Sequence, residues 1–471
     1  MAEGSSQSSV SGAPARLELP RALGASHATA IVVGTIIGSG VFLVPQEMMQ
    51  AVGSARMVYL AWIVGGMLSL FGALTYAELG ALKPEAGGEY VYIRDGYGPL
   101  PAFLYAWTWF LIAKPASIAS VTIGLVRILG TFRIFSFLPH TAISLPFPIT
   151  YAQLLAMLVT IAISFLNYLG IKKAGDFQLV FTTLKVLMIL GIIVVGFGSG
   201  KGDIHNFAST FTGAQGGLAG FMTALVAALW AYDGWNDLSM VSGEVANPRR
   251  NIPIALVVGV LMVAVLYMGV NGAVQYLLPA AGVAASPRPA SDATRLAIGA
   301  LGAAIVSAGM ALSMVVTLNG TIMSGARIPF AVARDGYFFS ALATVHKRFR
   351  SPSTSIVVQA IAAVLLLFMV SKFQQLFSLA IFSEWLFYMI AASTIFIFRR
   401  REPLAERSYK TWGYPVVPAL FVAASALLLY YTFAQNFRNS LVGSLIILAG
   451  IPLFYYFAGK RNTTAALRTE N

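Results

Sequence analysis

The sequence predicts an all-α polytopic membrane protein with twelve transmembrane helices, of which the first and sixth are broken. The 471 residues are 58% hydrophobic and only 10% charged, and their mean hydropathy is +0.76. A soluble chain carries about 25% charged residues. Twelve apolar stretches approach or exceed the roughly 20 residues that a helix needs to cross a bilayer. Two of these stretches contain glycines that oppose a continuous helix.

The predicted spans alternate with short polar connections that carry most of the basic residues. They are 27–50, 57–82, 101–131, 150–169, 175–198, 217–243, 253–277, 295–325, 353–370, 376–398, 414–433 and 440–458. An even number of spans places both termini on one side, and that side holds 21 Lys and Arg against 8 on the other. Because basic residues concentrate in cytoplasmic loops, both tails are predicted to be cytoplasmic. Residues 1–26 are polar and are expected to be a disordered tail, and residues 459–471 form a second tail.

The first span is interrupted by glycine. Gly34, Gly38 and Gly40 lie within it, and each interior glycine costs a helix roughly 0.5–1 kcal/mol relative to alanine. The sixth span is interrupted in the same way at Trp230-Ala-Tyr-Asp-Gly-Trp-Asn236. Paired interruptions in the two halves of a polytopic chain indicate a transporter's central binding site.

The interrupted spans lie five spans apart, and this spacing predicts an inverted repeat. Spans one to five (27–198) form the first repeat and spans six to ten (217–398) the second. Residues 414–458 then provide two peripheral spans. This division depends on the position of the breaks, because the two halves show no other internal similarity.

Composition excludes several other classes. The net charge of +13 lies in loops between apolar stretches, so it indicates membrane orientation and no nucleic-acid partner. The chain has no cysteine and four histidines, without metal-ligand spacing, a phosphate-binding loop or a nucleophilic triad. An enzyme, a resident cofactor and a metal site are therefore not expected.

Particular motifs resemble the amino acid-polyamine-organocation superfamily. They are Gly34-Thr-Ile-Ile-Gly-Ser-Gly-Val-Phe42 and Tyr76-Ala-Glu-Leu-Gly80, the latter continuing through Gly87-Gly88-Glu89-Tyr90. Others resemble its L-type amino acid transporter branch, in a bacterial-type member: Lys114-Pro-Ala-Ser117, Phe181-Thr-Thr-Leu-Lys185, Trp230 to Asn236, and Asn319-Gly320. The resemblance covers nearly the whole chain from span one. It implies a leucine-transporter-like fold and sodium-independent exchange of neutral L-amino acids.

The resemblance also implies which groups bind the substrate. Gly38, Ser39 and Gly40 would bind the carboxylate at the start of a half-helix, whose positive dipole end favours an anion. The carbonyl groups of Ile36, Trp230 and Asp233 would bind the ammonium. The alternative is that these glycines only allow helices to pack closely.

Side chains around the breaks have further expected roles. Trp230 is expected to close over the substrate as a gate, although an ordinary core contact is the alternative. Tyr232 and Asn236 either support the pocket or only pack between helices. Ser117 and Asn319 are carried over by motif as candidates for the side-chain pocket.

Charged residues within the predicted spans include Asp233, Lys185, Lys114 and Glu384, and an unpaired charge in a membrane is expensive. Asp233 could relay protons, bind a cationic group or hydrogen-bond a neighbouring helix. Lys185 is expected to replace the cation that sodium-coupled proteins of this architecture hold between spans one and five; snorkelling is the alternative. Lys114 is either a helix-bend feature or a site residue. Glu384 has no assigned role.

The sequence therefore predicts an amino acid exchanger that works by alternating access. A proton-coupled symporter is the alternative, and a non-transporting receptor or channel is a distant one. The loop 132–149 lacks the cysteine through which animal relatives attach a glycoprotein, so no disulfide-linked heavy chain is expected. We expect a monomer or weak oligomer in the bacterial inner membrane, where the lipid bilayer and the amino acid substrate are its partners.

Overall fold

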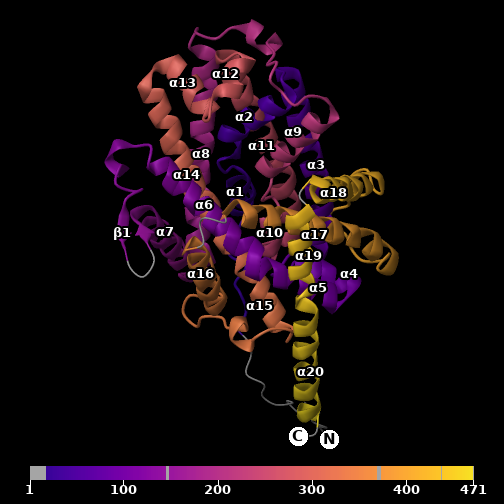
Figure 1. Cartoon of the computed structure of the whole chain (residues 1–471). Helices are drawn as coiled ribbons and strands as arrows, with labels where there is room; N and C mark the ends of the chain where they lie inside the picture. Colours follow the sequence, from indigo (N-terminus) through magenta and orange to yellow (C-terminus); the bar gives the residue numbers. More distant parts are fainter. Residues whose placement is uncertain (1–16, 145–147, 369–372, 436, 470–471) are drawn as a thin grey trace, which may run out of the picture.

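The computed structural model describes residues 17–144, 148–368, 373–435 and 437–469, and these are almost entirely helical (Figure 1). Nine helical stretches in this part of the chain are long and apolar enough to cross a membrane. They are Ala25–Val52, Ala55–Leu82, Pro99–Leu129, Tyr151–Tyr168, Ile171–Gly198, Pro248–Leu277, Ala300–Arg334, Val416–Ala434 and Ser440–Arg461. Two shorter apolar helices, Gly217–Ala231 and Ser353–Phe368, occupy the predicted spans six and nine. Predicted span ten lies within α17 (Phe373–Arg401).

The first predicted span is interrupted at Gly38, whereas Gly34 lies within α1 and Gly40 begins α2. Three residues separate α1 (Ala25–Ile36) from α2 (Gly40–Val52). In the sixth span, α9 (Gly217–Ala231) ends before a turn of five residues, and the short α10 (Asp237–Met240) follows. Both interruptions leave backbone groups without a helical partner in the middle of the protein.

Other helix boundaries differ from those predicted. The span expected at 295–325 begins instead at α14 (Ala300–Gly325), because Gly299 has a φ of +77° and ends α13 (Pro289–Ile298). The third span is divided into α5 (Pro99–Thr108), the π-helical turn η1 (Trp109–Ala113) and α6 (Lys114–Leu129). Such π-helical turns occur often at functional sites. The last span is divided into α19 (Phe437–Leu448) and α20 (Gly450–Thr469).

The remaining elements connect or flank these spans. The other long helices are α3 (Ala55–Leu82), α7 (Tyr151–Tyr168), α8 (Ile171–Gly198), α11 (Pro248–Leu277), α16 (Ser353–Phe368) and α18 (Val416–Gln435). Short helices are α4 (Glu89–Tyr97), α12 (Ala280–Ala285) and α15 (Arg327–Arg334). A two-stranded antiparallel hairpin, β1 (Thr141–Ile143) with β2 (Ile149–Thr150), precedes α7.

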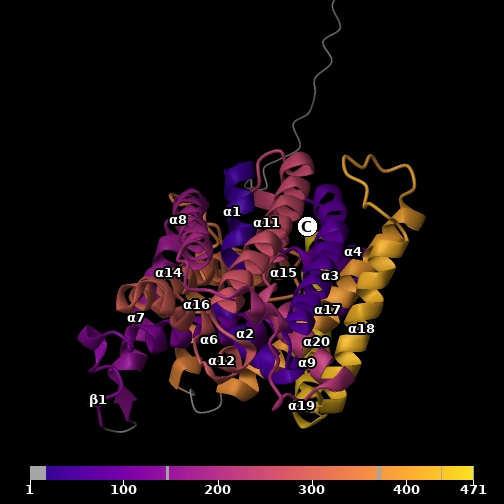
Figure 2. The same ribbon diagram turned by 90° about the horizontal axis from the view of Figure 1, so that it is seen from above.

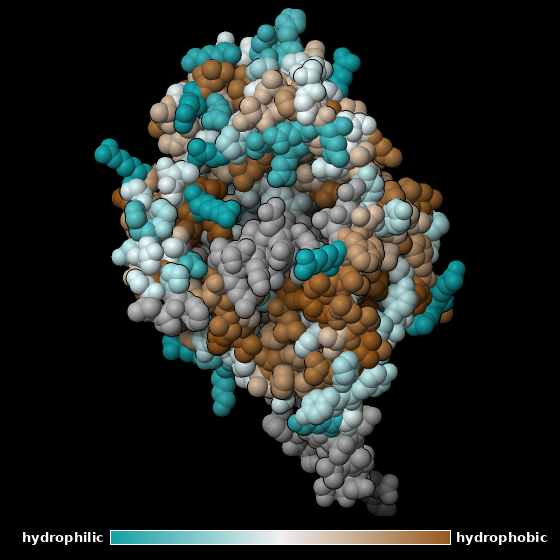
Figure 3. Space-filling view, in the orientation of Figure 1, coloured by the Kyte–Doolittle hydropathy of each residue, from teal (hydrophilic) through white to brown (hydrophobic). Residues whose placement is uncertain are grey.

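The broken first span is the centre of the bundle. Its most apolar window is 78% buried, against 28% for α7 and α8 and 22% for α18. Seen from above, α18 lies at one edge and α7 with β1 at the opposite edge (Figure 2). Brown hydrophobic side chains cover much of the face around α5, α17 and α19, while teal groups gather at the end that carries α12 and α13 (Figure 3). This distribution suits a bundle whose flanks contact lipid.

The two halves of the broken span are held at opposite ends. Before α1, Leu23 pairs with Val245 as an isolated bridge, and its amide donates to the Glu244 carbonyl at 3.0 Å. After α2, the Gln50 amide donates to the Ala284 carbonyl at 2.8 Å. The interruption between the two halves therefore lies in the interior, where the candidate site is found.

Candidate functional site

The two interrupted segments touch each other across the centre of the protein. The Thr35 hydroxyl donates to the Gly234 carbonyl at 2.8 Å, and Tyr267 directs its hydroxyl at the carbonyls of Ile36 (3.1 Å) and Ala231 (2.9 Å). Gly234 has a φ of +107°, and a Cβ there would lie 3.0 Å from the Thr35 carbonyl carbon. A larger residue at 234 would therefore separate the two breaks.

A cavity of about 100 Å³ opens beside this junction. Seven of the ten predicted substrate-binding residues line it: Ile36, Gly38, Ser39, Gly40, Ser117, Trp230 and Asp233. Three other helices complete its walls. α6 contributes Ser120 and Val121, α14 contributes Thr317 and Thr321, and α17 contributes Glu384. On α6, Ser120 and Val121 lie three and four residues after Ser117, and on α14 Thr317 and Thr321 are four residues apart, so each group shares one helix face.

The start of α2 gives the cavity a group suited to an anion. Gly38, Ser39 and Gly40 lie at the N-terminus of this helix, where the first amides lack intrahelical partners. A helix N-terminus carries a partial positive charge, so a carboxylate is stabilised there. No metal-binding group of three or more His, Asp or Glu side chains occurs within the described ranges.

Charged side chains surround the same cavity. The Lys114 ammonium, at the end of the π-helical turn, donates to Asp237 at 2.5 Å, and both side chains are less than one tenth exposed. Asp233 accepts a hydrogen bond from the Tyr388 hydroxyl at 2.9 Å. Glu384 lines the cavity without a hydrogen bond to any residue the structure describes. Three carboxyl groups thus face one ammonium in this cavity.

A hydrogen-bonded chain connects the second break to α4. The Tyr388 hydroxyl also lies 3.1 Å from the Asn236 side-chain oxygen, and the Asn236 amide donates to Glu89 at 2.7 Å. The other Glu89 oxygen accepts from Tyr105 at 3.1 Å. Burial raises the pKa of Glu89, which begins α4, to about 7, although these donors and Lys114 oppose the shift.

Lys185 lies behind the first break and is fully buried. Its ammonium donates to the carbonyls of Gly34 at 2.9 Å and Ile37 at 2.6 Å. The hydroxyls of Ser313 and Thr317 donate to the same turn: Ser313 to Ile37 at 2.7 Å and Thr317 to Gly34 at 3.1 Å. The carbonyls released by the interruption are therefore bound by one ammonium and two hydroxyls.

Three predicted site residues do not line the cavity. Tyr232 packs edge-on against Trp62, with ring centroids 5.6 Å apart. Asn236 belongs to the chain that reaches Glu89. Asn319 joins α14 to α7 and α8, since its amide donates to Gln178 at 2.8 Å and its oxygen accepts from Asn167 at 2.9 Å.

Sequence reasoning left other cavity residues unassigned. Asp237, Ser120, Thr317 and Thr321 received no role, and Glu384 was noted only as a charge within a span. The helical spacing of Ser117 with Ser120, and of Thr317 with Thr321, was the available signal. No sequence signal indicated that Lys114 and Asp237 would pair.

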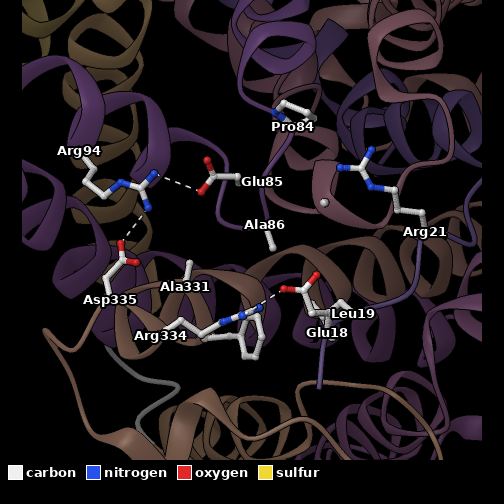
Figure 4. A pocket seen from close by; sticks show the side chains of 12 residues that line it. Glu18, Leu19, Arg21, Pro84, Glu85, Ala86, Arg94, Ala331, Arg334 and Asp335 are labelled. Atoms are coloured by element: carbon white, nitrogen blue, oxygen red, sulfur yellow. Dashed lines mark hydrogen bonds and ion pairs between the residues drawn. The ribbon is translucent and has the colours of Figure 1, made fainter. Parts of the chain in front are cut away.

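A second, charged cavity of about 420 Å³ lies where the chain enters α1 (Figure 4). It shares no lining residue with the central cavity. Arg94 on α4 bridges Glu85 at 3.1 Å and Asp335 at 2.9 Å, and Arg334 reaches Glu18 at 3.5 Å. The Arg334–Glu18 pair holds the segment before α1 near α15, and the Arg94 pairs join α4 to the loop before it and to the end of α15.

Comparison with known proteins gives one family along nearly the whole chain. Residues 23–457 match the family described as amino acid permease. The serine/threonine exchanger SteT of Bacillus subtilis (strain 168) is 33% identical over 440 residues, which are 93% of this chain and 97% of the relative. The human cystine/glutamate transporter is 31% identical over 94% of this chain and 86% of the relative. The human b(0,+)-type amino acid transporter 1 is 30% identical over 94% of this chain and 89% of the relative.

Proposed function

This chain belongs to the amino acid permease family of the APC superfamily, and from that premise we propose that it is a sodium-independent exchanger of neutral L-amino acids. Family membership makes it an integral membrane protein of amino acid transport and not an enzyme. The proposal adds the mode, the ion independence and the substrate class. SteT, named as a serine/threonine exchanger, supports exchange as the mode and small neutral substrates as the class.

The contact of Lys185 with the first break carries the ion-independent part of the proposal. Its ammonium lies 2.9 Å and 2.6 Å from two carbonyl oxygens released by the interruption. Carbonyl oxygens at such breaks coordinate sodium in ion-coupled transporters. A fixed ammonium would satisfy the same oxygens in every conformation. Transport would then need no bound sodium.

We propose that the substrate binds in the central cavity by its backbone groups. The amides at Ser39 and Gly40 would receive the carboxylate, and carbonyls at Ile36, Trp230 and Asp233 the ammonium. Trp230 would close over the substrate as the gate. Ser117, Ser120 and Val121 on α6 would face its side chain, and the small cavity favours a small one. Tyr232, Asn236 and Asn319 would support this arrangement from outside the cavity.

The finer architecture is part of the same proposal. Residues 27–198 and 217–398 would form a leucine-transporter-like inverted repeat within twelve spans, with 414–458 peripheral and both termini cytoplasmic. Alternating access would then move one repeat against the other around the two breaks. We propose a monomer or weak oligomer in a bacterial inner membrane, without a disulfide-linked heavy chain.

Proton-coupled uptake is the second candidate function. Asp233, Asp237 and Glu384 face the single ammonium of Lys114 in the cavity, so neutralising the site would require proton uptake or a cationic ligand. An inward pH gradient that drives uptake into vesicles without internal amino acid would establish this mechanism. Exchange requires the reverse result, with uptake that depends on internal amino acid and is insensitive to the gradient.

Serine and threonine uptake into proteoliposomes tests the proposal. Internal unlabelled serine should accelerate entry of labelled serine at least tenfold over empty vesicles, equally in sodium and potassium buffers. Arginine and glutamate inside the vesicles serve as charged comparisons and should accelerate it less. Acceleration by arginine alone would contradict the neutral substrate class while leaving exchange intact.

A further inference from the structure

An apolar groove runs along the outside of the bundle between α7 and α16. Its volume is about 670 Å³, and its walls are almost wholly aliphatic and aromatic side chains. Ile161 and Phe165 on α7 are 54% and 60% exposed, and Ile361 and Leu365 on α16 are 54% and 59% exposed. In a membrane protein, such a surface lies against lipid chains. The lining of this groove therefore suits a hydrocarbon tail.

Five basic side chains gather at one end of this groove. Lys172 and Lys173 begin α8, directly after α7, while Lys347, Arg348 and Arg350 lie in the loop before α16. All five are exposed, and none forms an ion pair with a residue in the described ranges. The nearest acid along α8, Asp176, is 2.9 Å from the His27 imidazole. The end of the groove therefore has a concentrated positive charge.

The basic loop is fixed to the end of α7. The Ser351 hydroxyl donates to the Tyr168 carbonyl at 2.7 Å, and the Tyr168 ring packs edge-on against both His346 (5.3 Å) and Phe349 (5.8 Å). A Cβ at Gly170 would lie 2.7 Å from the Phe349 carbonyl oxygen, so the α7–α8 turn and the loop are in contact. Tyr168 also lines the groove. The charged end and the apolar groove are one continuous surface.

An unpaired polar atom lies just inside the groove. The Ser164 hydroxyl is buried and has no hydrogen-bond partner within the part of the chain that the structure describes. Ser164 is one helical turn before Tyr168, which places it about 6 Å deeper along α7. A buried hydroxyl without a partner is costly, and a ligand acceptor at that depth would satisfy it.

We propose that this groove binds one anionic phospholipid of the surrounding bilayer. The acyl chain fills the groove between α7 and α16, and the ester oxygens below the phosphate accept from Ser164. The phosphate lies among Lys172, Lys173 and Lys347. Basic pockets between transmembrane helices bind anionic headgroups in this way. A zwitterionic lipid fits the apolar groove equally well but gains little from the charges.

Native mass spectrometry of the purified full chain tests the proposal. The probes are phosphatidylglycerol, phosphatidylcholine with identical acyl chains, and glycerol 3-phosphate, which carries the headgroup charge without the chains. Phosphatidylglycerol should bind at least tenfold more tightly than phosphatidylcholine, and glycerol 3-phosphate should not bind measurably. Equal retention of the two lipids would overturn the proposal, as would binding of glycerol 3-phosphate comparable to that of phosphatidylglycerol.

Two pairs of variants assign the binding to this groove. The triple variant K172Q/K173Q/K347Q should reduce phosphatidylglycerol binding to the phosphatidylcholine level, because each surface Lys or Arg contributes about fivefold to anionic lipid binding. The matched control R250Q/R400Q/K410Q removes three exposed charges elsewhere and should retain it. Ala360→Phe fills the groove and should weaken both lipids, whereas Ala423→Phe on the exposed face of α18 should not. Equal losses in test and control variants would refute the site.

Discussion

Replacing Lys185 by methionine removes the buried positive charge at the first break while keeping a side chain of similar length. The ammonium makes two charge-assisted hydrogen bonds, to Gly34 and Ile37, each contributing about 1.5–3 kcal/mol. The hydroxyls of Ser313 and Thr317 remain on the same carbonyls, and the variant no longer buries an ammonium. Because these effects offset each other, Lys185→Met should fold but lose the charge that replaces an ion.

Transport should therefore fall by tenfold or more. A tenfold loss corresponds to about 1.4 kcal/mol of barrier, which is less than one such hydrogen bond contributes. The assay is serine exchange in proteoliposomes, normalised to the amount of folded protein measured by size-exclusion chromatography. Lys173→Met, an exposed lysine on the same helix, is the matched control and should exchange normally.

Sodium sharpens this test. In Lys185→Ala, the shortened side chain leaves space beside the two carbonyls, and added sodium should restore part of the exchange. Lys185→Met fills that space and should gain nothing from sodium. Wild-type exchange in Lys185→Met, with an unchanged KM, would refute the view that this ammonium substitutes for an ion.

Three other substitutions test separate parts of the site. Gly40→Ala should abolish exchange without loss of folded protein, because the added Cβ would lie 3.0 Å from the Ala231 Cβ and 3.1 Å from the Ala231 Cα. Gly191→Ala is the control, since a Cβ there meets open space. An active Gly40→Ala variant would contradict the close contact of the two breaks. Trp230→Ala should raise the KM for serine about tenfold, because the substrate loses burial and stacking against the ring. Trp230→Phe keeps an aromatic ring and should retain most of the affinity. An unchanged KM in the alanine variant would argue against a gate. Glu89 has a folded-state pKa of about 7, above its ordinary value of 4.5, because burial opposes the ionised carboxylate. The folded state is therefore more stable at low pH, where this carboxyl is neutral, and it loses that stability as pH rises from about 4.5 through 7. Glu89→Gln should therefore show a smaller difference in melting temperature between pH 5 and pH 8 than the wild type, and an equal difference would show that this carboxyl does not titrate there.

Local chemistry made the breaks predictable. Gly38 and Gly40 weaken a helix through their own backbone freedom, and α1 ends at Ile36 as that argument requires. Gly234 interrupts the second segment, and its φ of +107° is one that other residues rarely adopt. Apolar length likewise located most spans, because crossing a bilayer depends on a property of each segment alone.

Contacts between distant segments were not predictable in the same way. Lys114 and Asp237 are 123 positions apart, and only the folded structure, which brings the start of α6 to the first residue of α10, makes them partners. Asn319 was placed in the side-chain pocket by motif, yet its amide is used by Gln178 and its oxygen by Asn167. The position of Glu384 at the cavity was likewise not predictable, because the sequence of its helix does not indicate which face meets the cavity.

Helix boundaries also depended on such details. Gly299 ends α13 and delays the start of the eighth span to Ala300, although the apolar pattern continues across it. Hydrophobicity does not distinguish the π-helical turn before Lys114 from its surroundings, because its five residues are as hydrophobic as the helix around them. Both features affect where side chains point and therefore which residues meet at the cavity.

Trans-stimulated uptake of labelled serine into proteoliposomes tests the central claim most directly. Vesicles containing unlabelled serine should accumulate label at least tenfold faster than empty vesicles, with no response to sodium or to an inward pH gradient. Accumulation into empty vesicles that is driven by the pH gradient would contradict exchange, and it would transfer the coupling role to the carboxyl groups of Asp233 and Glu384.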